Sequence, residues 1–283
     1  MMGAAGIVYY NGEYMPKEAV KLSPDDRGFL FADGIYEVIR AYWGQLFAVE
    51  AHLQRMRYGL RELQIRQPEL DFSMVAAKLL QDNHLDNSEA LVYIQITRGA
   101  APRVHAFPPA TIQPTIYAYA SAFSPPQKEW ETGVKIILTP DIRWLRCDIK
   151  STSLLPNILA NQQAKENNAY EAVFVRNGLV TEGSHTNFCA VFEGQLFTHP
   201  KSPYILPGIT RDVVLSLCGE LKIPVQEYPI LEKELKKADE MMVVGTTTEI
   251  MPVVQVNDWP VGDGQPGPVT RKLQQIFRGK ITK

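Results

Sequence analysis

The chain is poor in cysteine and histidine, the side chains that build disulfide frameworks and many metal sites. It contains only Cys147, Cys189 and Cys218, and its five histidines show no metal-ligand spacing such as two on one helical face. Three scattered cysteines exclude a disulfide-built fold, and we expect no bound metal. We expect the cysteines themselves to be small buried groups.

The sequence also lacks any block of basic residues, and its net charge is -2. Binding to nucleic acid or to a membrane surface through bulk electrostatics is therefore not expected. No apolar run approaches the ~20 residues that span a bilayer. The first residues, MMGAAGIVYYNGEYM, do not have the pattern of a secretory signal. We therefore expect a cytoplasmic protein.

What is present is an ordinary globular composition, with 45% apolar and 21% charged residues in a chain of 283. This length exceeds that of a usual single domain, so we expect two. The consecutive prolines in AFSPPQKEW indicate a short stiff connection. We predict a small N-terminal domain over residues 1–121, a linker over 122–129 and a large C-terminal domain over 130–283.

Hairpins dominate the pattern along the chain. Tight turns are predicted between β-rich runs at Asn11-Gly12, Trp43-Gly44, Asn177-Gly178 and Glu193-Gly194. Helices are predicted over residues 50–65, 71–83, 157–169, 208–221 and 269–277, and further strands over 90–99, 114–121, 134–139, 240–249 and 251–256. Asp71 or Ser73 is placed to cap the second helix. Because βαβ repeats are absent, we expect an α+β protein with mixed or antiparallel sheets.

Lys150 ends the run DIRWLRCDIK, in which apolar residues alternate with charged ones before a polar turn. A lysine in a partly desolvated pocket can bind an aldehyde cofactor as an imine. A pyridoxal-type ring also needs a carboxylate at its protonated nitrogen, and Glu182 in TEGSHTNF is the candidate. A single lysine after an apolar segment is more often a solvated surface group. Other features must therefore support this interpretation.

Two segments of the second domain suit a phosphate group. In LPGITRDVV, a glycine precedes a helix and leaves the amides of Ile209 and Thr210 facing outward, with the helix dipole behind them. In VVGTTTEI, a strand ends in a glycine and three threonines. Each segment alone is more often an ordinary helix start or strand end. Both together, downstream of Lys150, favour a phosphate-bearing cofactor.

The loop RGAAPRVH places Arg103 and His105 two positions apart, on a segment stiffened by prolines. An arginine fork binds a carboxylate through two parallel hydrogen bonds, and a neighbouring histidine adds a donor. An exposed loop with an incidental ion pair is the alternative. Tyr36 is by itself more typical of a half-buried strand aromatic. The glycine pattern at 262–267, GDGQPG, has a proline inside it and no following βα unit, so nucleotide binding there is not expected.

Six segments resemble, in this order, the fold type IV pyridoxal-phosphate aminotransferases. They are DDRGFLFADGIYEVIRAY, RGAAPRVHAFP, DIRWLRCDIKSTSLLPNILA, EAVFVRNGLVTEGSHTNF, LPGITRDVV and GTTTEIMPV, and they cover nearly the whole chain. The RGxxPRxH loop is the more specific part and is similar to that of the D-amino-acid aminotransferases. The other segments are shared with branched-chain aminotransferases and aminodeoxychorismate lyases. The resemblance implies a smaller α/β N-terminal domain and a larger, barrel-like mixed-sheet domain that binds the cofactor.

The resemblance also implies a role for each candidate residue. Lys150 is the Schiff-base lysine and proton carrier, and Glu182 pairs with the pyridine nitrogen of pyridoxal 5'-phosphate. The phosphate is held by Arg55, Ile209, Thr210 and Thr246, and Leu206 packs near the ring. The substrate carboxylate is held by Tyr36, Arg103 and His105, the last two reaching in from the partner subunit of a homodimer. The chain departs from the family pattern at His185 and Gly245.

The implied reaction is ping-pong transamination between a D-amino acid, such as D-alanine, and a 2-oxo acid, such as 2-oxoglutarate. Three alternatives stay open at this point. A branched-chain L-amino-acid aminotransferase and an aminodeoxychorismate lyase would use the same cofactor residues. A non-catalytic protein would have Lys150 as a structural residue.

Overall fold

The computed structural model describes residues 6–281, and the chain separates into two compact units. Unit 1 comprises Met1–Ser124 and Ile149–Ser153, and unit 2 comprises Pro125–Asp148 and Leu154–Lys283. From sequence position alone, the stretch around Lys150 was placed in the C-terminal domain. It groups with unit 1 because its backbone pairs with a strand there, where Ser151 forms a β-bridge with Ile35.

Unit 1 contains, within the described residues, a six-stranded antiparallel sheet in the order β2-β1-β6-β5-β3-β4. The strands are β1 (Ile7–Tyr10), β2 (Glu13–Pro16), β3 (Gly34–Tyr42), β4 (Gln45–Leu46), β5 (Ala90–Thr97) and β6 (Thr115–Ala122). The turns predicted at Asn11-Gly12 and Trp43-Gly44 are confirmed. All four residues have positive φ, which the tight hairpin turn requires.

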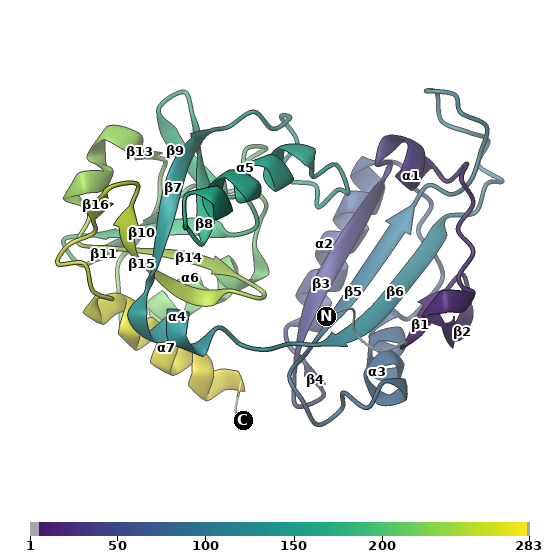
Figure 1. Cartoon of the computed structure of the whole chain (residues 1–283), viewed down its shortest axis with the longest axis horizontal. Coiled ribbons are helices and arrows are strands. Elements are labelled where there is room, and N and C mark those ends of the chain that lie inside the picture. Colours follow the sequence, from purple (N-terminus) through teal and green to yellow (C-terminus); the bar gives the residue numbers. More distant parts are fainter. Residues whose placement is uncertain (1–5, 282–283) are drawn as a thin grey trace. The chain divides into compact units, whose positions relative to one another are not determined.

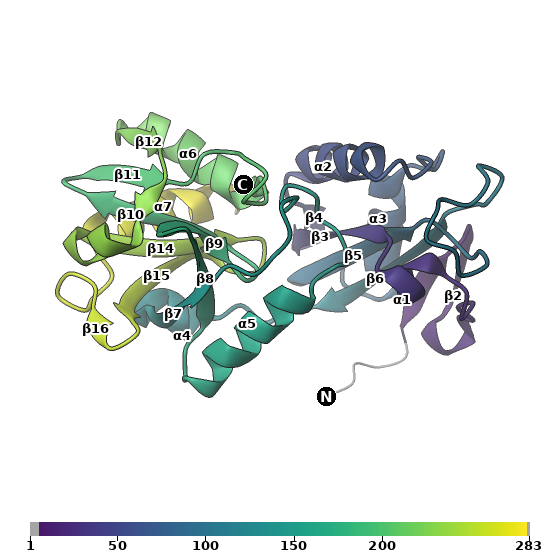
Figure 2. The ribbon, with the colours of Figure 1, turned by 90° about the horizontal axis from the view of Figure 1, so that it is seen from above.

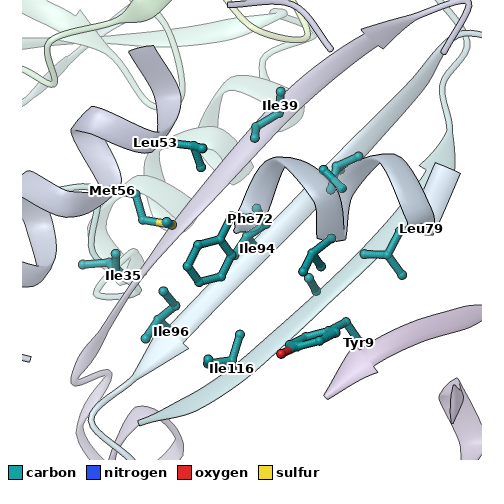
Figure 3. Close-up of a cluster of buried hydrophobic side chains, with 14 of the residues drawn as sticks. Tyr9, Ile35, Ile39, Leu53, Met56, Phe72, Leu79, Ile94, Ile96 and Ile116 are labelled. Atoms are coloured by element: carbon teal, nitrogen blue, oxygen red, sulfur yellow. The ribbon is translucent and has the colours of Figure 1, made fainter. Parts of the chain in front are cut away.

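Two helices, α2 (Val49–Glu62) and α3 (Phe72–Asp82), lie on one face of this sheet (Figure 1, Figure 2). Leu53 and Met56 of α2 and Phe72 and Leu79 of α3 pack with Ile39, Ile94 and Ile96 of the strands in one buried cluster (Figure 3). Burial of these side chains is the main stabilising contribution in unit 1. Asp71 caps α3 as predicted, accepting from the amides of Ser73 and Met74. The short helix α1 (Arg27–Phe31) and the 3-10 turn Lys17–Ala19 were not predicted.

Unit 2 contains a mixed sheet in the order β12-β11-β10-β14-β15-β7-β8-β9-β13, with β16 paired to β15. The strands are β7 (Val134–Pro140), β8 (Glu171–Arg176), β9 (Leu179–Gly183), β10 (Asn187–Phe192), β11 (Gln195–Thr198), β12 (Val225–Glu227), β13 (Ile230–Leu231), β14 (Glu240–Gly245), β15 (Glu249–Val256) and β16 (Trp259–Pro260). An additional pairing joins β9 to β10 at Glu182 and Asn187. That pairing closes a ring of strands, so the expected barrel-like mixed sheet is confirmed.

The helices of unit 2 are α4 (Gln127–Thr132), α5 (Leu155–Glu166), α6 (Ile209–Leu221) and α7 (Pro268–Ile281), with a 3-10 turn at Glu232–Lys237. The helix α4 begins inside the predicted linker, because Pro126 occupies its N-cap position, where a missing N–H costs nothing. Pro156 similarly lies in the first turn of α5, which begins earlier than predicted.

The three cysteines are buried and unpaired, as expected. Among residues 6–281, no helix combines the length and the apolar character that a bilayer crossing requires.

Candidate active site

Lys150 lies on the stretch of unit 1 that runs along β3. The amide of Tyr36 donates to the Lys150 carbonyl at 3.0 Å, and the amide of Thr152 donates to the Gly34 carbonyl at 3.0 Å. The neighbouring Ile149 is buried in the core of unit 1. The Lys150 Nζ lies 4.2 Å from the centroid of the Tyr36 ring. The structure therefore brings together Lys150 and Tyr36, two of the candidate residues predicted from the sequence.

Arg55, on α2, is anchored by a fully buried carboxylate. Its Nε donates to Oε1 of Glu37 at 2.7 Å and its Nη2 donates to Oε2 at 2.8 Å. His52 Nδ1 lies 2.8 Å from the same Oε2. Burial alone would raise the pKa of Glu37, but the charge and hydrogen bonds of Arg55, with those of His52, hold that pKa at about 2. Glu37 is thus ionised and fixes the orientation of Arg55.

This ion pair predicts a pH dependence of stability. The folded-state pKa of Glu37 is about 2 against an ordinary value of 4.5, so the pair stabilises the fold above pH 4.5. That stabilisation, on the order of 3 kcal/mol, is lost as the pH falls from 4.5 toward 2. Urea unfolding of the cofactor-free protein should therefore show Glu37→Gln less stable than the parent, by a larger margin at pH 6 than at pH 3.

The matched control is Glu50→Gln, which removes an exposed carboxylate that pairs with Arg57 on the same helix. The change in stability between pH 6 and pH 3 should be nearly the same in Glu50→Gln as in the parent. If Glu37→Gln lowered stability equally at both pH values, the ionised state of Glu37 would not be the source of the stabilisation.

The loop with Arg103 and His105 is exposed and contains neither helix nor strand. The Arg103 guanidinium carbon lies 5.1 Å from the centroid of the Phe31 ring, and the His105 ring centroid lies 5.5 Å from it. Both side chains therefore gather at one aromatic ring of α1. Two donors that share a small exposed region suit the binding of a carboxylate.

In unit 2, Glu182 is 4% exposed and lies at the end of β9. Its carboxylate accepts from Nη1 of Arg143 at 2.5 Å, from Nδ2 of Asn187 at 3.0 Å and from the amide of Leu206 at 3.0 and 3.1 Å. Burial raises the pKa of Glu182 to about 7, against the opposing effect of the Arg143 charge and the Leu206 amide. This carboxylate has donors on both oxygens and is held in one orientation.

Arg143, which was not predicted from the sequence, is itself buried and held by Asp141. Its Nε and Nη2 both donate to the Asp141 carboxylate at 2.9 Å. Arg143 stands 39 residues before Glu182, so no spacing rule links the two in the sequence. The one available signal is the alternation of charged and apolar residues that ends at Lys150.

A second set of residues gathers where α6 begins. Its N-cap, Gly208, has no side-chain cap, so the first amides of the helix are not capped by a side chain. A Cβ at Gly208 would lie 1.8 Å from Oδ1 of Asn187, which leaves glycine as the residue that fits. Asn187 also donates to the Leu206 carbonyl at 2.9 Å and pairs across the sheet with Val244.

Asn187 therefore donates to both Glu182 and Leu206. It does so beside Gly208, at the start of α6, where Ile209 and Thr210 lie. The end of β14, which precedes Thr246, pairs with the same strand. These residues fit pyridoxal phosphate, because a buried carboxylate is present for a protonated ring nitrogen and an uncapped helix start is present for a phosphate.

The two positions that depart from the family pattern are also adjacent. A Cβ at Gly245 would lie 3.5 Å from the His185 carbonyl oxygen, which is an ordinary van der Waals contact. His185 Nδ1 lies 2.9 Å from Oε2 of Glu171, a fully buried carboxylate that also accepts from the Ser184 and Thr186 hydroxyls. Glu171 was not selected from the sequence, and it holds the turn that follows Glu182.

The sequence-predicted residues thus fall into two sets. Unit 1 carries Tyr36, Arg55, Arg103, His105 and Lys150, and unit 2 carries Glu182, Leu206, Ile209, Thr210 and Thr246. The contacts described above lie within each unit.

Known proteins with similar sequences and folds point to one family. A D-alanine aminotransferase of Staphylococcus epidermidis is 42% identical over 279 residues, which are 97% of each chain. A D-alanine aminotransferase of Staphylococcus haemolyticus is 43% identical with the same coverage. The crystal structure of a branched-chain amino acid aminotransferase from Escherichia coli has a TM-score of 0.90 at 26% identity, covering 97% of this chain and 94% of that one.

The family model described as amino-transferase class IV matches residues 34–256, from the first residue of β3 to the last of β15. That range includes Tyr36, Lys150, Glu182 and the start of α6. The chain therefore belongs to the class IV aminotransferases.

Proposed function

We propose that this aminotransferase exchanges amino groups between D-amino acids, such as D-alanine, and 2-oxo acids, such as 2-oxoglutarate. The observation that carries this proposal is the joint exposure of Arg103 and His105 at the Phe31 ring. The relatives named D-alanine aminotransferases, at 42 and 43% identity, support it further. The branched-chain enzyme with a similar fold has 26% identity.

The cofactor is pyridoxal 5'-phosphate, which supplies an aldehyde that binds amines and a ring that takes up electrons while its nitrogen is protonated. We assign to Glu182 the task of keeping that nitrogen protonated. Its four hydrogen bonds from Arg143, Asn187 and Leu206 fix the carboxylate before the cofactor arrives. A protonated ring nitrogen would add a second positive partner and favour the ionised carboxylate.

We assign the phosphate to Arg55, Ile209, Thr210 and Thr246, with Leu206 packing near the ring. The Glu37 carboxylate prevents Arg55 from swinging freely, so little side-chain entropy remains to be lost when a phosphate binds. The amides of Ile209 and Thr210 stand at the uncapped start of α6, where the helix dipole favours an anion.

We assign to Lys150 the transfer of the proton from the substrate Cα. A lysine must be neutral to accept that proton. Tyr36, whose ring lies under the amine, is assigned to the substrate carboxylate together with Arg103 and His105. With the lysine on one fixed side of the substrate, the placement of the carboxylate selects the enantiomer.

We further propose that the chain is a homodimer in which Arg103 and His105 serve the partner subunit's catalytic site. Apolar side chains are exposed on and beside this loop, namely Phe29, Val104 and Phe107. In unit 2, Ile142, Trp144 and Leu145 are likewise exposed in the run before Lys150. Exposed apolar groups of this extent are typical of surfaces that contact another protein.

The enantiomer of the preferred substrate tests the proposed function. With 2-oxoglutarate as acceptor, the kcat/KM for D-alanine should exceed that for L-leucine by about a hundredfold or more. The products to be measured are pyruvate and 4-methyl-2-oxopentanoate. Preferential formation of the latter would replace the proposal with a branched-chain L-aminotransferase, and release of pyruvate from aminodeoxychorismate would replace it with a lyase.

A further inference from the structure

The loop that carries Arg103 and His105 is exposed, yet one buried side chain holds its backbone. The Arg27 guanidinium donates through Nη1 to the Val104 carbonyl at 2.6 Å and the Ala106 carbonyl at 3.4 Å. Its Nη2 donates to the His105 carbonyl at 3.3 Å. Three consecutive carbonyls thus turn toward a single cation.

Arg27 is 3% exposed and is fixed on its other sides. Its Nε donates to Oδ2 of Asp33 at 2.8 Å, and its amide donates to the Gly99 carbonyl at 3.0 Å. The guanidinium carbon lies 4.8 Å from the centroid of the Phe31 ring, the ring that Arg103 and His105 also approach. The guanidinium therefore approaches the same ring as the two donors.

The helix that carries Arg27 is bound to the end of β5. The Asp26 carboxylate accepts from the Gly28 amide at 2.8 Å and from the Thr97 hydroxyl at 3.0 Å. A Cβ at Gly28 would lie 2.2 Å from Cγ2 of Thr97, so only glycine allows this approach. The position of Arg27 is thus set by packed elements rather than by the loop it holds.

A second arginine holds the next part of the loop through the same carboxylate. Arg98 donates to Asp33 through Nε at 2.7 Å and through Nη2 at 3.0 Å. It also donates to the carbonyls of Leu63 and Gln64 at the end of α2, and its guanidinium carbon lies 3.7 Å from the centroid of the Phe107 ring. Asp33 therefore connects Arg27, which contacts the loop from Val104 to Ala106, with Arg98, which contacts Phe107.

We propose that Arg27 is a positioning residue for substrate binding: by holding the carbonyls of Val104, His105 and Ala106, it fixes the Arg103 and His105 side chains in the arrangement that binds the substrate carboxylate. The inference rests on the proposed function, which assigns the carboxylate to these two side chains. Without Arg27, the loop has to be ordered when the substrate binds, and the ordering entropy raises KM. Arg27 itself does not touch the substrate.

The contact pattern distinguishes this role from a purely structural one. Each carbonyl that accepts from the Arg27 side chain belongs to the loop, and none of them belongs to a helix or strand. Loss of this guanidinium should therefore release the loop more than the fold.

Steady-state kinetics of the holoenzyme with D-alanine and 2-oxoglutarate provide the test. Arg27→Met should raise the KM for D-alanine by about tenfold to a hundredfold, the size expected for a misplaced binding group, with a smaller change in kcat. The KM of Arg27→Lys should lie between those of the parent and Arg27→Met, because an ammonium has three donors for the same carbonyl acceptors. The matched control, Arg61→Met, removes an exposed arginine of the same unit and should leave KM unchanged.

Hydrogen exchange of the loop amides gives a second readout that does not depend on turnover. Exchange over residues 103–107 should be faster in Arg27→Met than in the parent and unchanged in Arg103→Met. The affinity for pyridoxal phosphate should be the same in all variants. If Arg27→Met does not fold, Arg27→Lys and Asp33→Asn carry the test with the same expected directions.

An unchanged KM in Arg27→Met, or a fall in kcat and cofactor affinity without a rise in KM, would overturn the inference. The comparison with Arg103→Met separates it from the proposed function. If Arg103→Met raises KM and Arg27→Met does not, only the positioning role fails. If Arg103→Met leaves KM unchanged, the assignment of the carboxylate to this loop fails, and the inference fails with it.

Discussion

Lys150→Ala should abolish transamination, with kcat reduced on the order of a thousandfold or more, because it removes both the group that binds the cofactor covalently and the proposed base. The phosphate residues remain, so the variant should still bind pyridoxal phosphate. The absorption band that covalent attachment produces should be lost. The matched control is Lys165→Ala, which removes an exposed lysine of α5 and should keep both the band and the activity.

Borohydride reduction followed by mass spectrometry locates the attachment directly. In the parent protein, the label should lie on the peptide that contains Lys150. A label on any other lysine, or normal activity in Lys150→Ala, would reject the assignment of this residue.

Arg103→Ala should lower kcat/KM for D-alanine by about two to four powers of ten, since loss of a charged two-point contact costs ~3 to 5 kcal/mol. The guanidinium is exposed at the Phe31 ring, so its removal should not disturb the core of unit 1. The cofactor spectrum should therefore be unchanged. Near-normal kinetics in this variant would remove the loop from substrate binding.

Mixed dimers test whether this arginine acts in the partner subunit. When Lys150→Ala and Arg103→Ala chains are coexpressed and the heterodimer is isolated, one site would contain both defects and the other neither. Activity per heterodimer should then approach half that of the parent dimer. If Arg103 acted within its own chain, both sites would carry one defect, and the heterodimer would be no more active than Arg103→Ala.

The local features of this fold were predictable from the sequence. The turns at Asn177-Gly178 and Glu193-Gly194 form as predicted, and both residues of each pair adopt the positive φ that such turns require. The cap of Asp71 on α3 is equally local. The short helix α1 was missed because its stability comes from contacts such as the one between Asp26 and Thr97, which are 71 residues apart.

The same distinction applies to the site. Lys150 and Glu182 could be selected from the sequence as candidates, because the segments that carry them resemble those of the aminotransferase family. Their supporting residues could not be selected in this way. Arg143 holds Glu182, and Glu37 holds Arg55, through single side-chain contacts that no periodicity indicates. The importance of Arg143 and Glu37 comes from the burial of their side chains and from the groups that these side chains face, and only the folded chain shows both.

The pairing of the Lys150 stretch with β3 has a consequence for modular engineering. The chain leaves unit 1 at Ser124, returns for Ile149–Ser153 and leaves again. A fragment cut after Ser124 would lack the lysine, and the complementary fragment would carry it without the strand edge at Gly34 and Tyr36 that orders its backbone. If only the N-terminal residues up to Ser124 were exchanged between relatives, the chimaera would combine β3 from one parent with the Lys150 segment from the other. Chimaeras should therefore take both segments from the same parent.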